Sequence, residues 1–261
     1  MSSLTMALRD SGAMLRRDLR HTMRMPSFLV SSIGMPVIML LMFVGLFGKS
    51  LGEGVTGGSG DYINYVAPGI ILMTGAFGSG VTAVSICLDM TEGIVDRFRT
   101  MAITRSSVLT GQVVGSVLRA LLSVSLVTCI TLLMGFDPNA TAVEWVAAIG
   151  VFTMLTFALT WMVVAVGLLT KNPAGANTAT MPLQFLPFLS SAFVPTDSMP
   201  TGVRWIAEYQ PFTPVTETVR GLLLGTEIGS SAWESIAWCA GLALIGYLWS
   251  RHLFNTKEAV R

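Results

Sequence analysis

Six stretches of the chain carry no charged side chain over a length close to that of a membrane-spanning helix. A helix needs about 20 apolar residues to cross the hydrocarbon core of a bilayer. Only 12% of the residues are charged, whereas soluble domains average about 25%. The chain therefore lacks the charge to cover a soluble surface, and a soluble enzyme is excluded. The uncharged stretches are Met25–Gly48, Tyr62–Leu88, Ala120–Phe136, Trp145–Thr170, Asn172–Thr196 and Ser235–Ser250.

These stretches are expected to form helices. Backbone groups in lipid must hydrogen-bond within the protein, so a span is either a helix or a strand of a closed barrel. Barrel strands alternate apolar and polar residues, and the third and fourth stretches are apolar throughout. Arg119 and Arg251 lengthen the two short stretches by reaching their charge to the interface. We predict an all-α membrane protein with a single transmembrane domain, 1–261, and six transmembrane helices at about 26–48, 62–88, 110–136, 144–170, 174–196 and 232–251.

Lys and Arg are distributed unevenly between the two sides of these spans. With both termini in the cytoplasm, the opposite side holds only Lys49, Arg204 and Arg220 of the 16 Lys and Arg. Positive charge concentrates on cytoplasmic loops, so both termini are expected inside. The turn Lys171–Pro173 supports this orientation least, because it contributes a single positive charge.

Residues 4–24 have the pattern of an amphipathic helix. Leu8, Leu15, Leu19 and Met23 share one stripe, and most arginines of this segment lie off it. Anionic lipid headgroups attract such a helix, although the same pattern suits a helix packed on a soluble partner. We expect an interfacial helix because a span follows directly.

The loop between the second and third spans mixes charged residues with apolar Ile94 and Phe98. Thr91 is a candidate cap for a short helix with apolar and charged faces, which would fit a groove on a soluble partner. The alternative is an ordinary solvated cytoplasmic loop, and composition alone favours that alternative.

The stretch after the fifth span is too apolar for a free loop and too rich in proline for a span. Val203–Tyr209 and Pro214–Leu224 fit short helices. Broken helices at membrane depth need protein or a water-filled cavity around them, so a re-entrant element is expected. Glu217 and Arg220 are spaced to form an i,i+3 ion pair; alternatively they and Glu208 face outward into water.

Two motifs in these segments resemble the permease subunits of type-2 ATP-binding-cassette exporters, and most closely the daunorubicin-resistance group. The first is Glu92-Gly93-Ile94-Val95-Asp96-Arg97-Phe98-Arg99 followed by Ile103-Thr104-Arg105. The second is Phe193-x-Pro195 with Met199-Pro200, then Gln210-Pro211-Phe212-Thr213-Pro214 and Arg220-Gly221. Met101-Ala102 departs from the family, in which a proline commonly precedes the isoleucine.

The resemblance implies a permease that pairs with a second permease, identical or paralogous, on two cytoplasmic ATPase subunits in the bacterial plasma membrane. Residues 91–100 would be the coupling helix and 197–225 the re-entrant outer element. ATP and Mg would bind the partner ATPase, and no cofactor, metal or nucleic acid is expected on this chain. Its coupling residues would be Glu92, Gly93, Ile94, Asp96, Arg97, Phe98 and Arg99, and its outer residues Glu208, Pro211, Pro214, Glu217 and Arg220.

The cargo is less defined. Asn177, Gln184, Ser190 and Ser191 are candidate pathway residues, although the favoured alternative is that they form hydrogen bonds between helices around proline kinks. The leading hypothesis is export of a hydrophobic small molecule, drug or lipid. Export of a polysaccharide or lipid-linked glycan, or a non-transport membrane scaffold, are the alternatives. No convergent catalytic set is recognised, so the chain alone is not expected to be an enzyme.

Overall fold

The computed structural model describes residues 26–48, 62–91 and 105–259, and every regular element in these ranges is a helix. The all-α prediction is confirmed for this part of the chain. The expected interfacial helix at 4–24 lies outside the described residues, as does the expected coupling helix apart from Thr91. Thr91 is the last residue of the preceding helix, and its hydroxyl donates to the carbonyl oxygen of Leu88 at 3.0 Å.

Within the described ranges, three helices are long and apolar enough to cross a membrane: α4 (Tyr62–Thr91), α6 (Arg105–Leu133) and α7 (Ala142–Leu169). They occupy the second, third and fourth predicted spans. The first predicted span is α2 (Pro26–Leu40) continued by the π-helix η1 (Leu41–Leu46). The last lies within α11 (Ser231–Ala259).

The fifth predicted span, 174–196, is not one helix. Helix α8 (Pro173–Phe185) has 13 residues, and the 3₁₀-helix η2 (Leu186–Leu189) follows it. At 1.5 Å per residue α8 is about 20 Å long, short of the ~30 Å hydrocarbon core. Pro187 lies in the first turn of η2 and has no N–H to continue the α-helical hydrogen bonds.

The proline-rich stretch that follows contains η3 (Thr196–Ser198), α9 (Thr201–Tyr209) and α10 (Phe212–Leu224). Short helices therefore occur at both places where the sequence predicts them. Gly225 ends α10 with a φ of +72°, a left-handed conformation that glycine adopts without steric cost. Most of α10 is buried, whereas Ala207 is the buried residue of α9.

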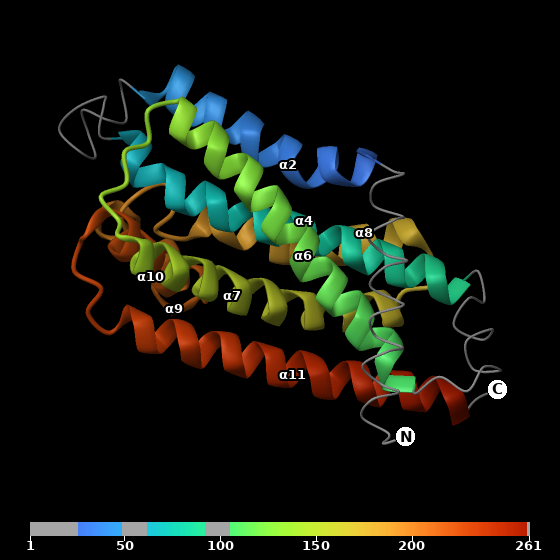
Figure 1. Ribbon diagram of the computed structural model, residues 1–261. Coiled ribbons are helices and arrows are strands. Elements are labelled where there is room, and N and C mark those ends of the chain that lie inside the picture. Colours follow the sequence, from blue (N-terminus) through green and yellow to red (C-terminus); the bar gives the residue numbers. More distant parts are fainter. Residues whose placement is uncertain (1–25, 49–61, 92–104, 260–261) are drawn as a thin grey trace.

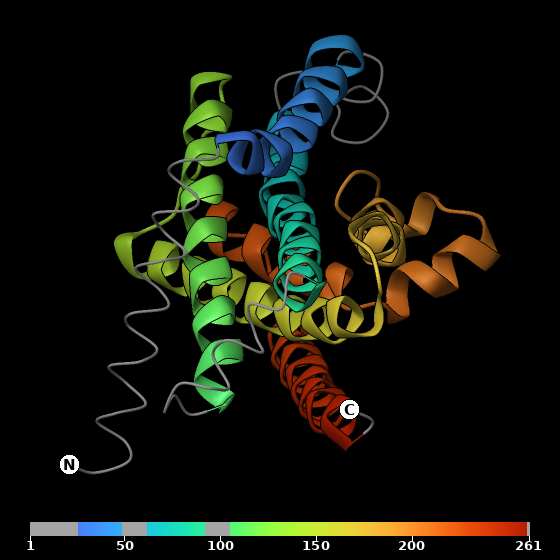
Figure 2. The same cartoon turned by 90° about the vertical axis from the view of Figure 1, so that its right-hand side faces the viewer.

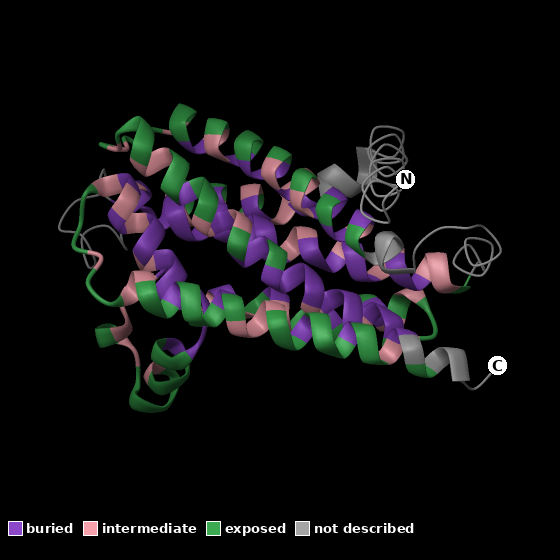
Figure 3. Cartoon of the chain, turned by 60° about the horizontal axis from the view of Figure 1, so that its bottom comes forward, coloured by how far each residue is buried: buried purple, intermediate pink, exposed green. Residues whose placement is uncertain are grey.

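Helix α4 forms the centre of the bundle. In its most apolar window 72% of the residues are buried, against 33% for α6, which lies at the edge. Figure 3 shows the buried residues on the helix faces turned to the middle of the bundle. Glycine allows the closest contacts: a Cβ on Gly246 of α11 would lie 2.7 Å from the backbone of Trp161 and Met162 in α7. Small residues at such contacts are typical of membrane helix bundles.

The two ends of the bundle differ. α2 begins and α11 ends at one end, where α4 also ends and α6 begins (Figure 1); we call this the termini end. Helix α10 lies at the opposite end, which we call the α10 end. The segment that contains α9 projects to the side of the long helices when the bundle is viewed from the termini end (Figure 2). The turn at Lys171 joins α7 to α8, and Asn172 caps α8 by accepting from Gly175 N at 2.6 Å.

Arg119 lies near the middle of α6, not at the end of a span as expected. Among its described side chains, the candidate membrane span of α6 covers Thr110–Leu133. At 1.5 Å per residue, Arg119 is about 14 Å from the first of these and about 21 Å from the second.

Candidate functional site

Arg220 of α10 connects three segments that are distant in sequence. Its Nε and Nη2 donate to the carbonyl oxygen of Tyr65 in α4 at 3.2 and 3.1 Å. Nη2 also donates to the carbonyl oxygen of Ser191, after η2, at 2.8 Å. The guanidinium lies 3.9 Å from the centre of the Tyr65 ring, a cation–π geometry. One side chain thus joins α10, α4 and the broken fifth span.

The carbonyl groups freed by the break are satisfied by side chains. The Tyr65 hydroxyl donates to the oxygen of Ser191 at 2.9 Å, and the Tyr62 hydroxyl donates to that of Phe193 at 3.4 Å. Thr213 Oγ1 accepts from Ser191 N at 3.3 Å and donates to the oxygen of Ala207 at 2.5 Å. Irregular backbone inside a membrane protein requires such partners.

We call Tyr65, Ser191, Thr213 and Arg220 the arginine cluster. Close backbone contact supports it, because a Cβ on Gly69 of α4 would lie 2.5 Å from Cβ of Ala192. Sequence reasoning missed Tyr65 and Thr213. Thr213 lies inside the quoted proline motif, but no spacing rule connects Tyr65 to a residue 155 positions away.

Buried polar atoms near these residues lack protein partners. Among the described residues, Ser191 Oγ and both amide atoms of Gln210 are buried without a hydrogen bond. Gln210 is 5% exposed and lies between α9 and α10. Leaving such groups unpaired costs about 1–3 kcal/mol each. These atoms are therefore available to a water molecule or to a polar group of a ligand.

Of the two arrangements considered for Glu217 and Arg220, the i,i+3 ion pair is not formed. Arg220 binds carbonyl oxygens instead, and Glu217 Oε2 accepts from the hydroxyl of Ser231 at 3.1 Å. Of these acceptors, the carbonyl of Ser191 follows the break in the fifth span, whereas that of Tyr65 lies in the first turn of α4. Pro211 and Pro214 are buried around the first turn of α10.

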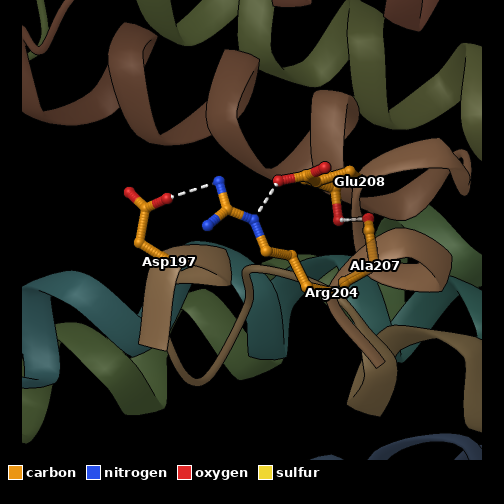
Figure 4. A network of polar contacts seen from close by, with 5 residues as sticks. Asp197, Arg204, Ala207 and Glu208 are labelled. Atoms are coloured by element: carbon orange, nitrogen blue, oxygen red, sulfur yellow. Dashed lines mark hydrogen bonds and ion pairs between the residues drawn. The ribbon is translucent and has the colours of Figure 1, made fainter. Parts of the chain in front are cut away.

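Glu208 belongs to a separate, exposed network on α9 (Figure 4). Arg204 Nε lies 2.6 Å from Glu208 Oε1, and Arg204 Nη2 lies 2.8 Å from Asp197 Oδ1. The hydrogen bond to Glu208 and the two negative charges raise the pKa of the Arg204 guanidinium above its ordinary value. The network fixes η3 against α9, but exposed pairs of this kind contribute little to stability.

The four candidate pathway residues do not form one site. Ser191 belongs to the arginine cluster, and Ser190 caps η2, its hydroxyl donating to the oxygen of Pro187 at 2.5 Å. Gln184 is buried, packs against Gly80 of α4, and donates to Thr180 Oγ1 at 3.0 Å. Asn177 is exposed. The hydrogen bonds of Ser190 and Gln184 stay within their own segments, whereas the backbone of Ser191 binds α4 and α10.

Of the residues expected to contact an ATPase, none lies within the described ranges. They are Glu92, Gly93, Ile94, Asp96, Arg97, Phe98 and Arg99. The helix ends on either side of them, Thr91 and Arg105, lie at the termini end. In the described part of the chain, no three His, Cys, Asp or Glu residues lie close enough together to hold a metal ion.

The amino-acid sequence matches a family of transporters. The family described as ABC-2 type transporter matches residues 10–224. The daunorubicin resistance ABC transporter permease protein DrrB1 of Streptomyces coeruleorubidus is 27% identical over 90% of this chain and 82% of its own length. The probable doxorubicin resistance ABC transporter permease protein DrrC of Mycobacterium tuberculosis is 22% identical over 83% of this chain and 77% of its own length. The putative transport permease ycf38 of Porphyra purpurea is 24% identical over 84% of this chain and 76% of its own length.

Proposed function

The chain belongs to the ABC-2 type transporter family, and from this premise we propose that it is the permease subunit of an exporter driven by a separate ATPase. As an ABC transporter permease it is a membrane protein, and its family implies a partner subunit that binds ATP. The proposed cargo is a hydrophobic small molecule, drug or lipid, moved out across the plasma membrane. The observation that carries this proposal is the likeness, over most of the chain, to permeases named for resistance to daunorubicin and doxorubicin.

We assign the termini end to the cytoplasm. The segment 92–104 connects two helix ends that lie there, in keeping with the excess of Lys and Arg in the stretches assigned to that side. In this proposal Ile94 and Phe98 make the apolar contacts with the ATPase, and Asp96, Arg97 and Arg99 make the polar ones. ATP binding would close the ATPase pair and move this segment, and the attached helices would shift as rigid bodies.

We assign the α10 end to the outer face. Trp205 and Tyr209 on α9 are 66% and 65% exposed, and their ring centres lie 5.6 Å apart. Exposed Trp and Tyr side chains concentrate at membrane–water interfaces, where the ring is apolar and its tip remains hydrated. The proposal places α9 at the outer interface, with the buried α10 behind it as the re-entrant element.

Co-purification with the ATPase tests the coupling assignment. The assay measures how much ATPase the tagged full chain retains in detergent as the salt concentration increases. The double substitution Arg97→Glu with Phe98→Ala is expected to reduce the retained amount about tenfold or more. The matched control makes the same kind of change on α9, with Arg204→Glu and Trp205→Ala, and should leave retention unchanged. A complex that survives the first pair of changes at high salt overturns the coupling assignment.

A second pair of measurements tests the subunit composition of the complex and which subunit hydrolyses ATP. We propose that two permeases, identical or paralogous, pair on two ATPase subunits, which native mass measurement of the complex resolves directly. The purified chain should hydrolyse no ATP until the ATPase is added. Hydrolysis by the chain alone contradicts the proposal.

A further inference from the structure

Two buried side chains where α9, α10 and the broken fifth span meet are polar and yet unpaired. Within the described part of the chain, Nε2 and Oε1 of Gln210 and Oγ of Ser191 make no hydrogen bond. Gln210 is 5% exposed and Ser191 is 2% exposed. Of the five buried side-chain atoms without a partner in the described residues, three therefore belong to this one junction.

Hydrogen bonds through Thr213 hold the junction together. Its Oγ1 donates to the carbonyl oxygen of Ala207 at 2.5 Å, which closes a turn around Gln210. The same oxygen accepts from Ser191 N at 3.3 Å, so the turn is fixed against the broken span. The backbone groups of the junction are thus paired, while the side-chain atoms of Gln210 and Ser191 are not.

Apolar side chains would be more stable in these two places. An unpaired polar group gives up its hydrogen bonds to water on burial, and replacing it by an apolar group of similar shape is neutral or stabilising. By contrast, the buried side chains of Gln184 and Ser190, in the same broken span as Ser191, do form hydrogen bonds. The missing partners are therefore particular to the junction, and they raise the free energy of the described arrangement.

We propose that Gln210 and Ser191 bias the α10 end toward an open arrangement. The proposal rests on the proposed function, in which this end is the outer face and opens to release cargo. The described arrangement, with α10 buried, is the closed one. When the turn around Gln210 separates from the broken span, water reaches the three unpaired atoms and supplies the hydrogen bonds that the closed arrangement lacks.

The arginine cluster acts in the opposite direction. Arg220 binds the carbonyl oxygen of Ser191, and Thr213 binds its N–H, across the surfaces that separate on opening. These bonds favour the closed arrangement, whereas the unpaired side chains oppose it. The two arrangements therefore stay close in free energy. A partner that binds one arrangement somewhat better than the other then suffices to open or close the α10 end.

A cysteine behind the turn reports opening in the purified full chain. Thr216 is 1% exposed and lies between Thr213 and Arg220 on one face of α10, at steps of three and four residues. With the three native cysteines replaced by alanine, the rate at which Thr216→Cys reacts with a maleimide in detergent measures how often this face becomes exposed.

Removing the unpaired atoms should keep the α10 end closed. Gln210→Leu in this background should slow the reaction about tenfold, because it removes two unpaired atoms from the closed arrangement. Ser191→Ala should slow it less, because it removes one. The assay contains no ATPase, so its failure would leave the coupling assignment standing, and co-purification tests that assignment separately.

The matched controls change side chains of the same kind that have partners. Gln184→Leu removes an amide bound to Thr180 Oγ1, and Ser190→Ala removes a hydroxyl bound to the oxygen of Pro187; neither should slow the reaction. Labelling of the Gln210→Leu chain at the original rate or faster overturns the proposal, because the amide would then have a partner in the closed arrangement, such as a buried water. If Gln210→Leu does not fold, Ser191→Ala decides, and an unchanged or faster rate again overturns the proposal.

Discussion

Removing Arg220 should destabilise the bundle more than any change to an exposed charge. Arg220→Gln deprives the carbonyl oxygens of Tyr65 and Ser191 of a charged donor, and it removes the guanidinium from the Tyr65 ring. Hydrogen bonds to charged groups contribute about 1.5–3 kcal/mol each. Arg220 is partly exposed, so the lower limit applies, about 3 kcal/mol for the two acceptors. The cation–π contact adds about 0.5–1 kcal/mol.

The measurement is thermal unfolding of the purified chain in detergent, followed by tryptophan fluorescence. A loss of about 3–4 kcal/mol corresponds to a fall in Tm of about 10 °C for a chain of this size. Arg204→Gln is the control, since its exposed ion pairs contribute at most about 1 kcal/mol. Combining Arg220→Gln with Tyr65→Leu should cost less than the sum of the two single changes, because both remove the same contact. A Tm for Arg220→Gln within about 2 °C of the control refutes the reasoning.

Three further predictions, on packing, helix capping and an exposed ion pair, use the same thermal assay. Gly246→Ala pushes a Cβ against the α7 backbone and should lower the stability of the fold by about 1–3 kcal/mol. Gly241→Ala lies on the same helix with open space around it and should raise the stability by up to about 1 kcal/mol. Equal effects of the two changes would contradict this packing. Thr141→Ala removes the capping box of α7 and should cost about 1 kcal/mol, and no change would show that the cap is dispensable. Glu208→Gln should cost under about 1 kcal/mol, with the difference disappearing at high salt; a larger, salt-independent loss would contradict the exposed pairing.

The sequence predicts the long apolar helices well because length and absence of charge are sufficient for them. α4 and α7 begin and end within about three residues of the predicted spans. The two short helices after the fifth span are also predicted, since prolines delimit them. The proline content of 174–196 indicates kinks, but it does not reveal that α8 ends at Phe185.

The site is less predictable because its contacts are not local. Spacing along α10 suggests Glu217 as the partner of Arg220, whereas its acceptors are the carbonyl oxygens of Tyr65 in α4 and of Ser191 after the break in the fifth span. Arg119 is similar. In a count of charges it marks the end of a span, whereas in the structure it lies near the middle of α6. Periodicity identifies which residues share a face, but not what that face contacts.

The orientation of the two ends of the bundle is the claim on which the account depends most. In a background with Cys87, Cys129 and Cys239 replaced by alanine, single cysteines at Asp96→Cys and Trp205→Cys can be labelled in intact cells with a membrane-impermeant maleimide. The account predicts labelling at Trp205→Cys, and at Asp96→Cys only after the membrane is permeabilised. Labelling of Asp96→Cys from the medium, with Trp205→Cys protected, would contradict it.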